Sequence, residues 1–295
     1  MHPKCRANVR IILMNNDLLA IHAKSFYWAS FFLSKETYNK CSSLYNFCRT
    51  LDDIADDNSD LEIKKKKFLE FKKNFSNKNF ENPIIKNMWD LLENEKISKV
   101  IVNDLFDGVE SDLENEVKIN SQKDLLVYSY RVAGTVGLMM SKILKVNDKE
   151  SLKGAIDLGI AMQLTNIARD VIEDKKRNRK YIDYDFSAIK ETINTADVFY
   201  RRSFPAIKAI PLSSRFSVIV ARRVYRKIGD YILKQKNIEN YSKAGKIYVP
   251  TFGKIIETIL SIGDFLKLLF GGNTNYSNDD SHSIINKEIN LDERI

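Results

Sequence analysis

The sequence predicts an all-α fold, and three observations support that prediction. Pro and Gly, which interrupt helices, number only 5 and 11 among the 295 residues. Strict alternation of apolar and polar residues, which marks half-buried strands, is scarce. Hydrophobic residues make up 44% of the chain, which is enough for a sizeable core. A chain of this length holds one large domain or two small ones, and we expect a single one.

Helical patterns divide the chain into three parts. A short extension over residues 1–14 precedes a helical domain over 15–270, and residues 271–295 are so rich in Asn, Ser and Asp that we expect a disordered polar tail. Ser34 and Ser151 are expected to cap the helices that follow them. The expected helices cover residues 15–33, 35–56, 84–92, 97–112, 124–145, 152–176, 189–203, 213–236 and 248–270, with an exposed basic helix and a loop in 58–82.

The net positive charge of the chain limits the kinds of molecule that it is expected to bind. A net charge of +8 suits nucleic acid, an anionic membrane surface or a polyanionic substrate. The basic residues are spread along the chain and no nucleic-acid motif with interleaved aromatic residues occurs, so we expect no nucleic-acid partner. A polyanionic substrate and a peripheral membrane contact remain.

Cysteine usage and the first residues indicate a cytoplasmic protein. The three cysteines, Cys5, Cys41 and Cys48, are odd in number and form no CxxC pair, which is a poor disulfide framework. The apolar run 11–14 is too short for a signal peptide. No apolar stretch reaches the ~20 residues that span a bilayer. We expect a cytoplasmic location, with loose association at the inner membrane face as a hypothesis.

An oxygen-rich stripe marks the expected helix 152–176. Four of its side chains follow at steps of three, four and four: Gln163, Asn166, Asp170 and Asp174. This spacing puts them on one face of a helix. Carboxylates one turn apart, beside amides, suit Mg²⁺, which takes oxygen ligands and often shares them with a substrate phosphate. Taken alone, such a stripe is also typical of a solvated helix face.

A second stripe on the expected helix 35–56 strengthens the functional interpretation. Its members follow at steps of four, three and four: Tyr45, Arg49, Asp52 and Asp56. Aspartates at the carboxyl end of a helix oppose the helix dipole, which favours cations there. A bound metal or ligand charge would offset that cost, so two such stripes predict a metal site.

Two further segments carry open alternatives. Gly134 and Gly137 interrupt the helical pattern of 124–145, where each costs about 1 kcal/mol against Ala. They allow tight helix packing, which we favour, a kink in the helix or room for a ligand. The strongly apolar stretch 255–270 is expected to be a core helix, with membrane contact as the alternative.

Four motifs then stand in the order found in the squalene/phytoene synthase family, which the chain resembles over most of residues 20–270. They are His22–Phe26, Tyr45–Asp56, Val132–Gly137 and Gln163–Tyr181. The match is nearly complete over 161–174, and within the family 133–140 is most similar to bacterial phytoene synthases. The family usually has Gly where Asn178 stands and Pro shortly after the Tyr, near Asp183. Because Asn tolerates a left-handed turn, we expect only a local change.

The resemblance implies a class I isoprenoid synthase helical bundle with a central cavity. It implies that Asp52 and Asp56 face Asp170 and Asp174, and that Mg²⁺, with Mn²⁺ as a substitute, bridges them to prenyl diphosphates. Asn166 joins these four as an implied metal ligand. Arg49 and Tyr45 match catalytic positions beside the aspartates. The implied substrate-binding residues are Lys24, Ser25, Phe26, Tyr128, Gln163, Asn166, Arg169, Arg179 and Tyr181.

The activity that the resemblance implies is the head-to-head (1'-1) joining of two geranylgeranyl diphosphates, through a cyclopropylcarbinyl diphosphate, to phytoene. No nicotinamide cofactor is expected, and a downstream desaturase is an expected partner. Squalene or dehydrosqualene synthesis from farnesyl diphosphate is the nearest alternative, and a non-catalytic helical assembly factor is another. Candidate walls for a water-excluding cavity are Phe26, Tyr27, Trp28, Phe47, Met139 and Met140.

Overall fold

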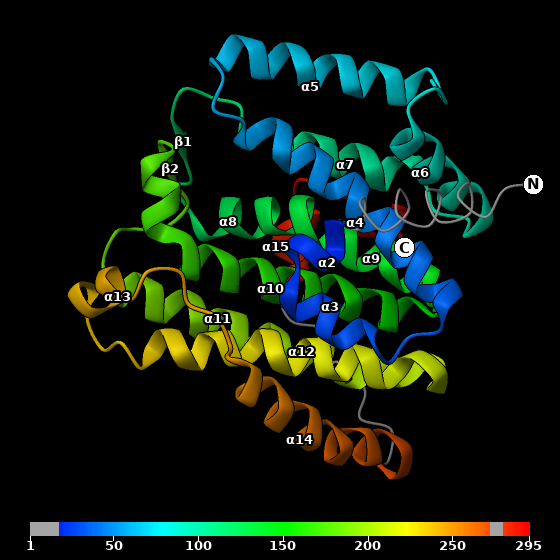
Figure 1. Cartoon of the computed structure of the whole chain (residues 1–295), viewed down its shortest axis with the longest axis vertical. Helices are drawn as coiled ribbons and strands as arrows, with labels where there is room; N and C mark the ends of the chain where they lie inside the picture. Colours follow the sequence, from blue (N-terminus) through cyan, green and yellow to red (C-terminus); the bar gives the residue numbers. More distant parts are fainter. Residues whose placement is uncertain (1–17, 272–279) are drawn as a thin grey trace, which may run out of the picture.

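The computed structural model describes residues 18–271 and 280–295, and these ranges are almost entirely helical (Figure 1). The expected extension 1–14 therefore lies outside the described residues. The first half contains α2 (Leu18–His22), α3 (Lys24–Ser30), α4 (Lys35–Asp56), α5 (Leu61–Ser76), α6 (Pro83–Asn94), α7 (Lys99–Glu110), α8 (Gln122–Ser129), a π-helical turn η1 (Tyr130–Gly134) and α9 (Thr135–Ile143). The all-α prediction is confirmed.

The second half is built around the longest of the described helices, α10 (Lys149–Lys176). It continues through α11 (Phe186–Ser203), η2 (Pro205–Ala209), α12 (Leu212–Leu233), α13 (Ile238–Ala244), α14 (Thr251–Phe270), α15 (Asp280–Asn286) and η3 (Leu291–Glu293). Two short parallel strands, β1 (Val117–Lys118) and β2 (Arg179–Lys180), pair beside the end of α10.

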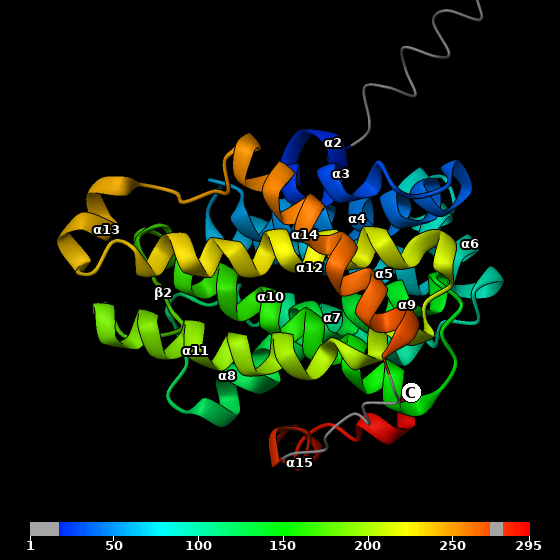
Figure 2. The same cartoon turned by 90° about the horizontal axis from the view of Figure 1, so that it is seen from below.

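Helix α10 lies at the centre of the bundle. It packs against η1 and α9 on one side and against α11, η2 and α12 on the other. Figure 1 shows α10 between α9 and α12, and in Figure 2 α11 and α12 lie in front of it. A large apolar core fills the space around α4, α6, α7, α9 and α10, and a second cluster joins α10 to α11 and α12. The stripe on α10 is thereby held inside the molecule.

Side-chain caps set where the two stripe-bearing helices begin. Ser34 accepts a hydrogen bond from the Thr37 amide at 3.2 Å, which confirms the predicted start of α4. Helix α10 begins three residues earlier than expected. Asp148 is its cap, since its Oδ1 accepts from the amide of Ser151 at 2.9 Å. The prediction of Ser151 as the cap is wrong because an aspartate one turn earlier already satisfies that amide.

Glycines bring the central helices unusually close together. A Cβ on Gly137 would lie 2.3 Å from the carbonyl oxygen of Ala155, and one on Gly159 would lie 2.2 Å from that of Ala133. No side chain fits at such distances, so α9 and η1 approach α10 backbone to backbone. Tight packing, the favoured interpretation of Gly137, is confirmed.

The expected disorder of the tail is wrong for residues 280–295. Ile285, Ile289 and Leu291 are buried against the main core, and Arg294 pairs with Asp104 at 3.0 Å. Apolar residues recur there at helical spacing within a polar sequence, which composition alone conceals. Residues 272–279 of the expected tail lie outside the described ranges.

Several other helices differ from the prediction in their bounds or in the side that they bury. The expected helix 15–33 is two helices, α2 and α3, and α13 was not anticipated. The basic helix α5 is exposed on one side but buries Phe68, Phe71 and Phe75. The apolar stretch 255–270 is not a core helix, since α14 buries only Gly253, Glu257, Ser261 and Leu268. None of the helices in 18–271 and 280–295 is both long and apolar enough to cross a bilayer.

Candidate active site

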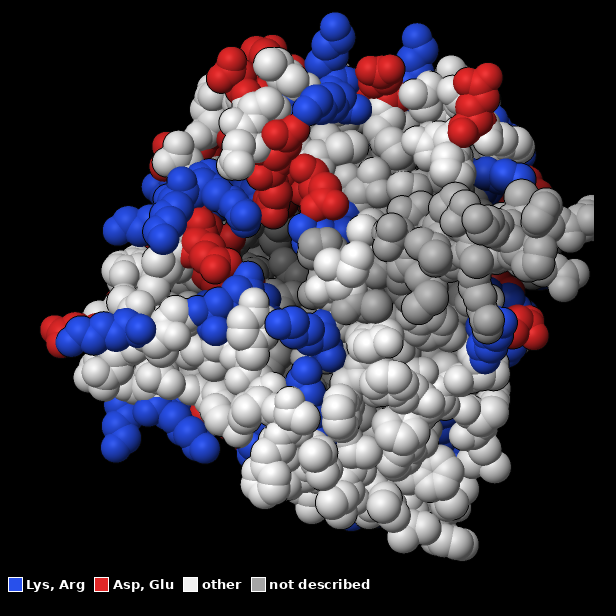
Figure 3. Space-filling view, in the orientation of Figure 1, with Lys and Arg blue, Asp and Glu red and all other residues white. Residues whose placement is uncertain are grey.

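A hollow ringed by acidic and basic side chains opens on the face shown in Figure 3. A cavity of about 640 Å³ lies between α3, α4, η1, α9, α10 and α12, and this volume is within the range of small-molecule sites. Its lining includes every member of the two predicted stripes: Tyr45, Arg49, Asp52 and Asp56 from α4, and Gln163, Asn166, Asp170 and Asp174 from α10. The fold therefore brings both stripes to one site.

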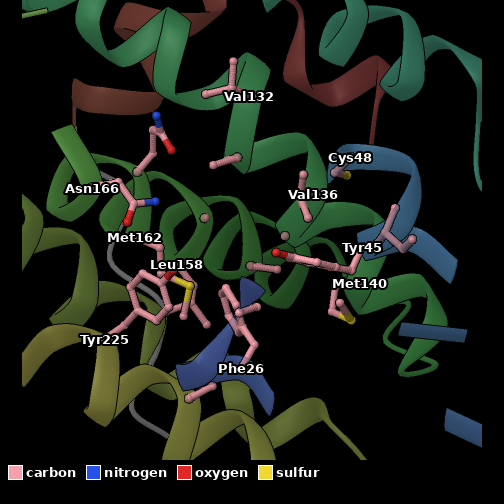
Figure 4. A pocket seen from close by; sticks show the side chains of 18 of the residues that line it. Phe26, Tyr45, Cys48, Val132, Val136, Met140, Leu158, Met162, Asn166 and Tyr225 are labelled. Carbon is pink, nitrogen blue, oxygen red and sulfur yellow. The ribbon is translucent and has the colours of Figure 1, made fainter. Parts of the chain in front are cut away.

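The cavity changes from polar to apolar along α10. Its aspartates come from the carboxyl ends of α4 and α10, whereas Leu158 and Met162 come from earlier turns of α10. At 1.5 Å per residue, Leu158 and Asp174 are about 24 Å apart along the helix axis. In Figure 4 the labelled side chains surround one space: Phe26, Tyr45, Cys48, Val132, Val136, Met140, Leu158, Met162, Asn166 and Tyr225. A long molecule with a charged end and an apolar chain fits such a space.

The predicted walls are only partly correct. Met140 lines the cavity, as expected. Phe47 and Met139 are instead fully buried in the core, where the Phe47 ring lies 5.4 Å from that of Phe75. Because a helix turns about 100° per residue, Phe47 points away from the face that Tyr45 presents to the cavity.

Helix α3 contributes less than the sequence predicted. Within the segment 24–28, Phe26 lines the cavity, but Lys24, Ser25, Tyr27 and Trp28 do not. The Lys24 residue is exposed to solvent on the first turn of α3. The structure thus does not bring Lys24 and Ser25 to the cavity wall, whereas the remaining predicted substrate-binding residues do line it: Tyr128, Gln163, Asn166, Arg169, Arg179 and Tyr181.

One aspartate of each stripe is held by cations. Asp56 pairs with Arg179 at 2.8 Å and with Arg177 at 3.2 Å. Asp170 receives two hydrogen bonds from Arg169, at 2.8 and 2.6 Å, and lies 3.4 Å from Lys246 Nζ. Arginine forks of this kind match carboxylate and phosphate geometry equally well. These cations are therefore placed where an incoming phosphate group would meet them.

The other aspartate of each stripe, Asp52 on α4 and Asp174 on α10, lacks such a cationic partner within the described ranges. Among the described residues, neither Asp52 nor Asp174 makes an ion pair. Asp52 is exposed on the cavity side and Asp174 is half-buried, but the cavity wall around each carboxyl group limits its hydration. Burial, reinforced by Asp56, raises the pKa of Asp52 to about 7. Burial, reinforced by Asp170, raises the pKa of Asp174 to about 7. Carboxyl groups in this state gain most from an added positive charge.

The donor set fits a magnesium ion that completes its shell with substrate oxygens. Asn166 Oδ1 is buried and has no hydrogen-bond partner among the described residues, so it is a free oxygen on the cavity wall. The four aspartates line the same cavity. In the described part of the chain, no three acidic, His or Cys side chains converge on a single point. Magnesium commonly takes one or two carboxylates together with substrate phosphates, not a full protein cage.

A network that the sequence did not reveal lies beside the aspartates. Tyr128 donates to Asp112 Oδ2 at 2.9 Å and Tyr181 donates to Oδ1 at 2.6 Å. The two tyrosine rings stack with their centroids 4.8 Å apart. Burial raises the pKa of the Asp112 carboxyl. Asp112 follows α7 with no spacing that links it to either stripe, so only the fold identifies it as part of the site.

Three other residues are also brought to the site by the fold alone. Tyr225 of α12 lines the cavity and its ring centroid lies 4.8 Å from that of Phe26. Lys246, in the loop after α13, reaches Asp170 as described. Tyr241 donates a hydrogen bond to the Arg169 carbonyl oxygen at 2.6 Å, which fixes the helix beneath the aspartates. None of them stands in a recognisable spacing.

The turn after α10 directs Arg179 and Tyr181 toward the cavity. Asn178 has φ of 56°, the left-handed conformation that Asn adopts more readily than most residues. Its carbonyl oxygen accepts from the Val117 amide at 3.0 Å, which starts the β1–β2 pairing. The left-handed turn expected at Asn178 is confirmed.

Comparison with known proteins agrees with this geometry. A family model for squalene/phytoene synthases matches residues 19–186. The 15-cis-phytoene synthase of Enterobacter agglomerans is 30% identical over 250 residues, which cover 72% of this chain and 82% of that protein. The phytoene synthase of Cereibacter sphaeroides is 28% identical over 251 residues, which cover 74% and 70%.

Solved structures show the same fold. A dehydrosqualene synthase crystallised with a ligand superposes with a TM-score of 0.70 at 25% identity, over 85% of this chain and 95% of that one. A squalene synthase from Alicyclobacillus acidocaldarius superposes with a TM-score of 0.62 at 15% identity, over 80% and 96%. With both predicted stripes on one cavity and these similarities in sequence, the chain belongs to the squalene/phytoene synthase family.

Proposed function

We propose that this chain is a phytoene synthase, a prenyltransferase that joins two geranylgeranyl diphosphates head to head (1'-1) through a cyclopropylcarbinyl diphosphate. One observation carries the proposal: two aspartate stripes and several arginines meet at the polar end of a cavity whose other end is apolar. The 30% identity to a 15-cis-phytoene synthase over most of both chains supports the choice of product.

The cations of the site bind and orient the diphosphate groups. Arg169, Arg179 and Lys246 already lie against the aspartates, within reach of a phosphate that replaces these contacts. Magnesium, when bound by Asp52, Asp56, Asn166, Asp170 and Asp174, supplies positive charge that stabilises the diphosphate as a leaving group. Arg49 lies in the same lining, with Asp53 holding its guanidinium at 2.6 Å.

The apolar part of the cavity protects the cationic intermediates from water. Phe26 and Tyr225 present aromatic rings to it, and Val136, Met140, Leu158 and Met162 complete the wall shown in Figure 4. Aromatic faces attract cations electrostatically. Exclusion of water prevents premature capture of an allyl cation.

The Asp112 network positions the groups around the diphosphate. Because Tyr128 and Tyr181 both donate to Asp112, their rings are fixed on the cavity wall. Arg179 is fixed in turn by the Ala55 carbonyl oxygen at 3.2 Å and by Asp56. These contacts hold the cations in place before substrate arrives, which reduces the entropy lost on binding.

The main alternative is a squalene or dehydrosqualene synthase acting on farnesyl diphosphate. The similarity to the solved dehydrosqualene synthase supports it. Chromatography of the products formed from each diphosphate in the presence of Mg²⁺ distinguishes phytoene synthesis from squalene or dehydrosqualene synthesis. A hydrocarbon formed from geranylgeranyl diphosphate supports phytoene synthesis, and turnover of farnesyl diphosphate alone refutes it. No turnover of either would favour a non-catalytic assembly factor.

The remaining parts of the functional picture are proposals as well. We expect Mg²⁺ to be replaceable by Mn²⁺, since both accept oxygen ligands in octahedral geometry. We expect no nicotinamide cofactor. We propose a cytoplasmic location on the ground of cysteine usage, and an apolar product suggests a peripheral membrane contact and a downstream desaturase partner.

A further inference from the structure

Helix α14 presents its apolar side to the outside. The residues that it buries are small or polar for the most part: Gly253, Glu257, Ser261 and Leu268. Its large apolar residues are exposed, with Phe252 at 72%, Ile259 at 61% and Phe270 at 83% of their maximal accessibility. Further exposed residues on this helix are Ile255, Ile256, Leu260, Ile262, Leu266 and Leu269. This is the reverse of an ordinary surface helix, which turns its apolar stripe to the core.

Polar contacts fix this orientation. Arg223 of α12 donates from Nε to Glu257 at 2.9 Å and from Nη1 to Asp264 at 2.7 Å. Trp28 of α3 donates to Thr258 at 2.9 Å. Rotating the helix to bury its apolar face would break these contacts and leave Arg223 without its partners, which is strongly unfavourable. The polar contacts therefore fix the orientation that leaves the apolar face of α14 exposed, and loose packing is not the cause.

The charges left at the surface of α14 are positive. Both of its acidic residues, Glu257 and Asp264, are turned toward Arg223. Lys267 is exposed, although its Nζ lies 3.7 Å from the half-buried Asp264, and Lys254 is partly exposed. At the other end of the helix, Lys208 of η2 donates to the Gly271 carbonyl oxygen at 3.3 Å. Figure 3 shows a broad white surface over this lower part of the molecule, without acidic groups on it.

We propose that the outward face of α14 docks on the surface of an anionic lipid bilayer. A helix of 20 residues lies about 30 Å along the membrane plane. Helices with an apolar face and lysines at its border bind in the interfacial layer, with their apolar side at the boundary between headgroups and acyl chains. Anionic headgroups attract the lysines.

The position of α14 links this surface to the cavity. Lys254 in the first turns of α14 donates to the Lys24 carbonyl oxygen at 3.2 Å. Lys24 begins α3, the helix that places Phe26 in the cavity wall. Docking through α14 therefore puts the bilayer beside an element of the cavity. The use of that bilayer as a reservoir for the apolar chains rests on the proposed function, but the docking surface itself does not.

A bilayer suits the face better than a second copy of the chain. In a two-fold dimer built on α14, the helices would lie parallel or antiparallel, and the same patch would meet itself. Either arrangement sets lysines of one copy against lysines of the other, because the acids are turned inward. Like charges that face each other across an interface oppose association.

Vesicle flotation of the full chain tests the proposal. The vesicles contain either phosphatidylcholine alone or equal parts of phosphatidylcholine and phosphatidylglycerol. The test variant is Ile259→Gln/Leu266→Gln/Phe270→Gln, which changes only exposed side chains. The matched control is Ile63→Gln/Leu69→Gln, which changes two exposed apolar residues of α5. Circular dichroism and turnover of substrate in detergent micelles check that each variant is folded.

We expect the wild type and the α5 control to float with the anionic vesicles and to bind less to the neutral ones. The α14 variant should lose at least about tenfold in partition coefficient, because it removes apolar area that inserts at the interface. Lys254→Gln/Lys267→Gln should weaken binding to anionic vesicles only. This second variant decides the question if the triple variant does not fold.

Three results would overturn the proposal: a wild type that does not float, an α14 variant that floats as well as the wild type, and a wild-type dimer in sedimentation that the α14 variant dissociates. The last result would show that the face joins two copies. Absence of flotation with intact turnover removes the membrane surface and leaves the proposed enzyme activity standing. Flotation without turnover of either diphosphate supports the membrane surface and removes the proposed enzyme activity.

Discussion

The guanidinium of Arg179 lies 2.8 Å from the carboxylate of Asp56, although the two residues are 123 positions apart in sequence. Asp56 is the last residue of α4 and Arg179 follows the turn that ends α10. This ion pair joins the two stripe-bearing helices at the polar end of the cavity. It also shows where a diphosphate oxygen would find a fork of donors.

Replacing Arg179 tests that role. Arg179→Gln should lower kcat/KM by about 100-fold or more, as removal of one preorganised donor from a developing negative charge does in other enzymes. Arg179→Lys should restore only part of the loss, because an ammonium lacks the planar fork whose two nitrogens donate to Asp56 and to the Ala55 carbonyl oxygen. Lys118→Gln, on the exposed side of the neighbouring strand, is the control and should retain turnover.

The raised pKa values of two cavity aspartates should make the metal-free protein less stable as the pH rises. The pKa of Asp52 and that of Asp174 are raised to about 7, above the value of about 3.9 for an unfolded aspartate. Between about pH 4 and pH 7 the folded chain therefore holds protons that the unfolded chain has released, and stability falls with rising pH. Asp52→Asn and Asp174→Asn should raise the melting temperature, by an amount that grows through this window and then levels.

Asp57 supplies a control of opposite sign for that experiment. Its hydrogen bond from Lys67 lowers its pKa, so its contribution to stability is present above about pH 4 and lost as the pH falls. Asp57→Asn should therefore lower the melting temperature at neutral pH. Thermal melts in the presence of a chelator measure all three variants, and stabilisation of Asp52→Asn that does not depend on pH would contradict the account.

Asp112 should matter for both stability and turnover. In Asp112→Asn one of the two acceptor oxygens becomes an N–H donor, so only one tyrosine can still donate to residue 112 and the other keeps the contact between the Tyr128 and Tyr181 hydroxyls at 3.1 Å. The loss of one hydrogen bond costs about 0.5–1.5 kcal/mol in unfolding free energy, and up to about 3 kcal/mol when the acceptor is charged. Turnover should fall as well, because the tyrosines lose their fixed positions. Asp107→Asn, at an exposed pair with Lys72, should change stability by less than about 0.5 kcal/mol, and equal effects would refute the network.

The close contact between α9 and α10 predicts a large effect of a single methyl group. Gly137→Ala would place its Cβ 2.3 Å from the Ala155 carbonyl oxygen, so it should destabilise the fold by about 1–3 kcal/mol. A Cβ on Gly263 would meet nothing within 4 Å, and Gly263→Ala in helix α14 should stabilise by about 0.5–1 kcal/mol. Denaturant melts measure both, and similar effects at the two positions would contradict the packing.

Local periodicity was sufficient for the two stripes and for most helices. Asp52 and Asp56, like Asp170 and Asp174, are one turn apart, so a helix by itself puts each pair on one face. That the two faces meet in one cavity is a property of the fold, which the family resemblance implied and the structure bears out. Asp112 and Lys246 reach the site through tertiary packing and carry no local pattern, so the residues alone could not identify them.

Helix α14 shows a second limit of sequence patterns. Its many apolar residues predicted a core helix, but the sequence pattern alone does not determine which face of the helix packs against the rest of the protein. The outcome depends on Arg223, which lies on α12 and pairs with Glu257 and Asp264. The tail failed as a prediction for a similar reason, since Ile285 and Leu291 bury themselves in a core that earlier helices provide.

The central claim is that both aspartate stripes hold one diphosphate site, and it is tested most directly by Mg²⁺-dependent turnover of geranylgeranyl diphosphate. Asp52→Ala on α4 and Asp170→Ala on α10 should each abolish hydrocarbon formation while the helical circular dichroism spectrum remains. Asp57→Ala, which removes the pair with Lys67 and the hydrogen bond from the Ser59 amide just after α4, should retain turnover. Wild-type turnover in either Asp52→Ala or Asp170→Ala would contradict the account.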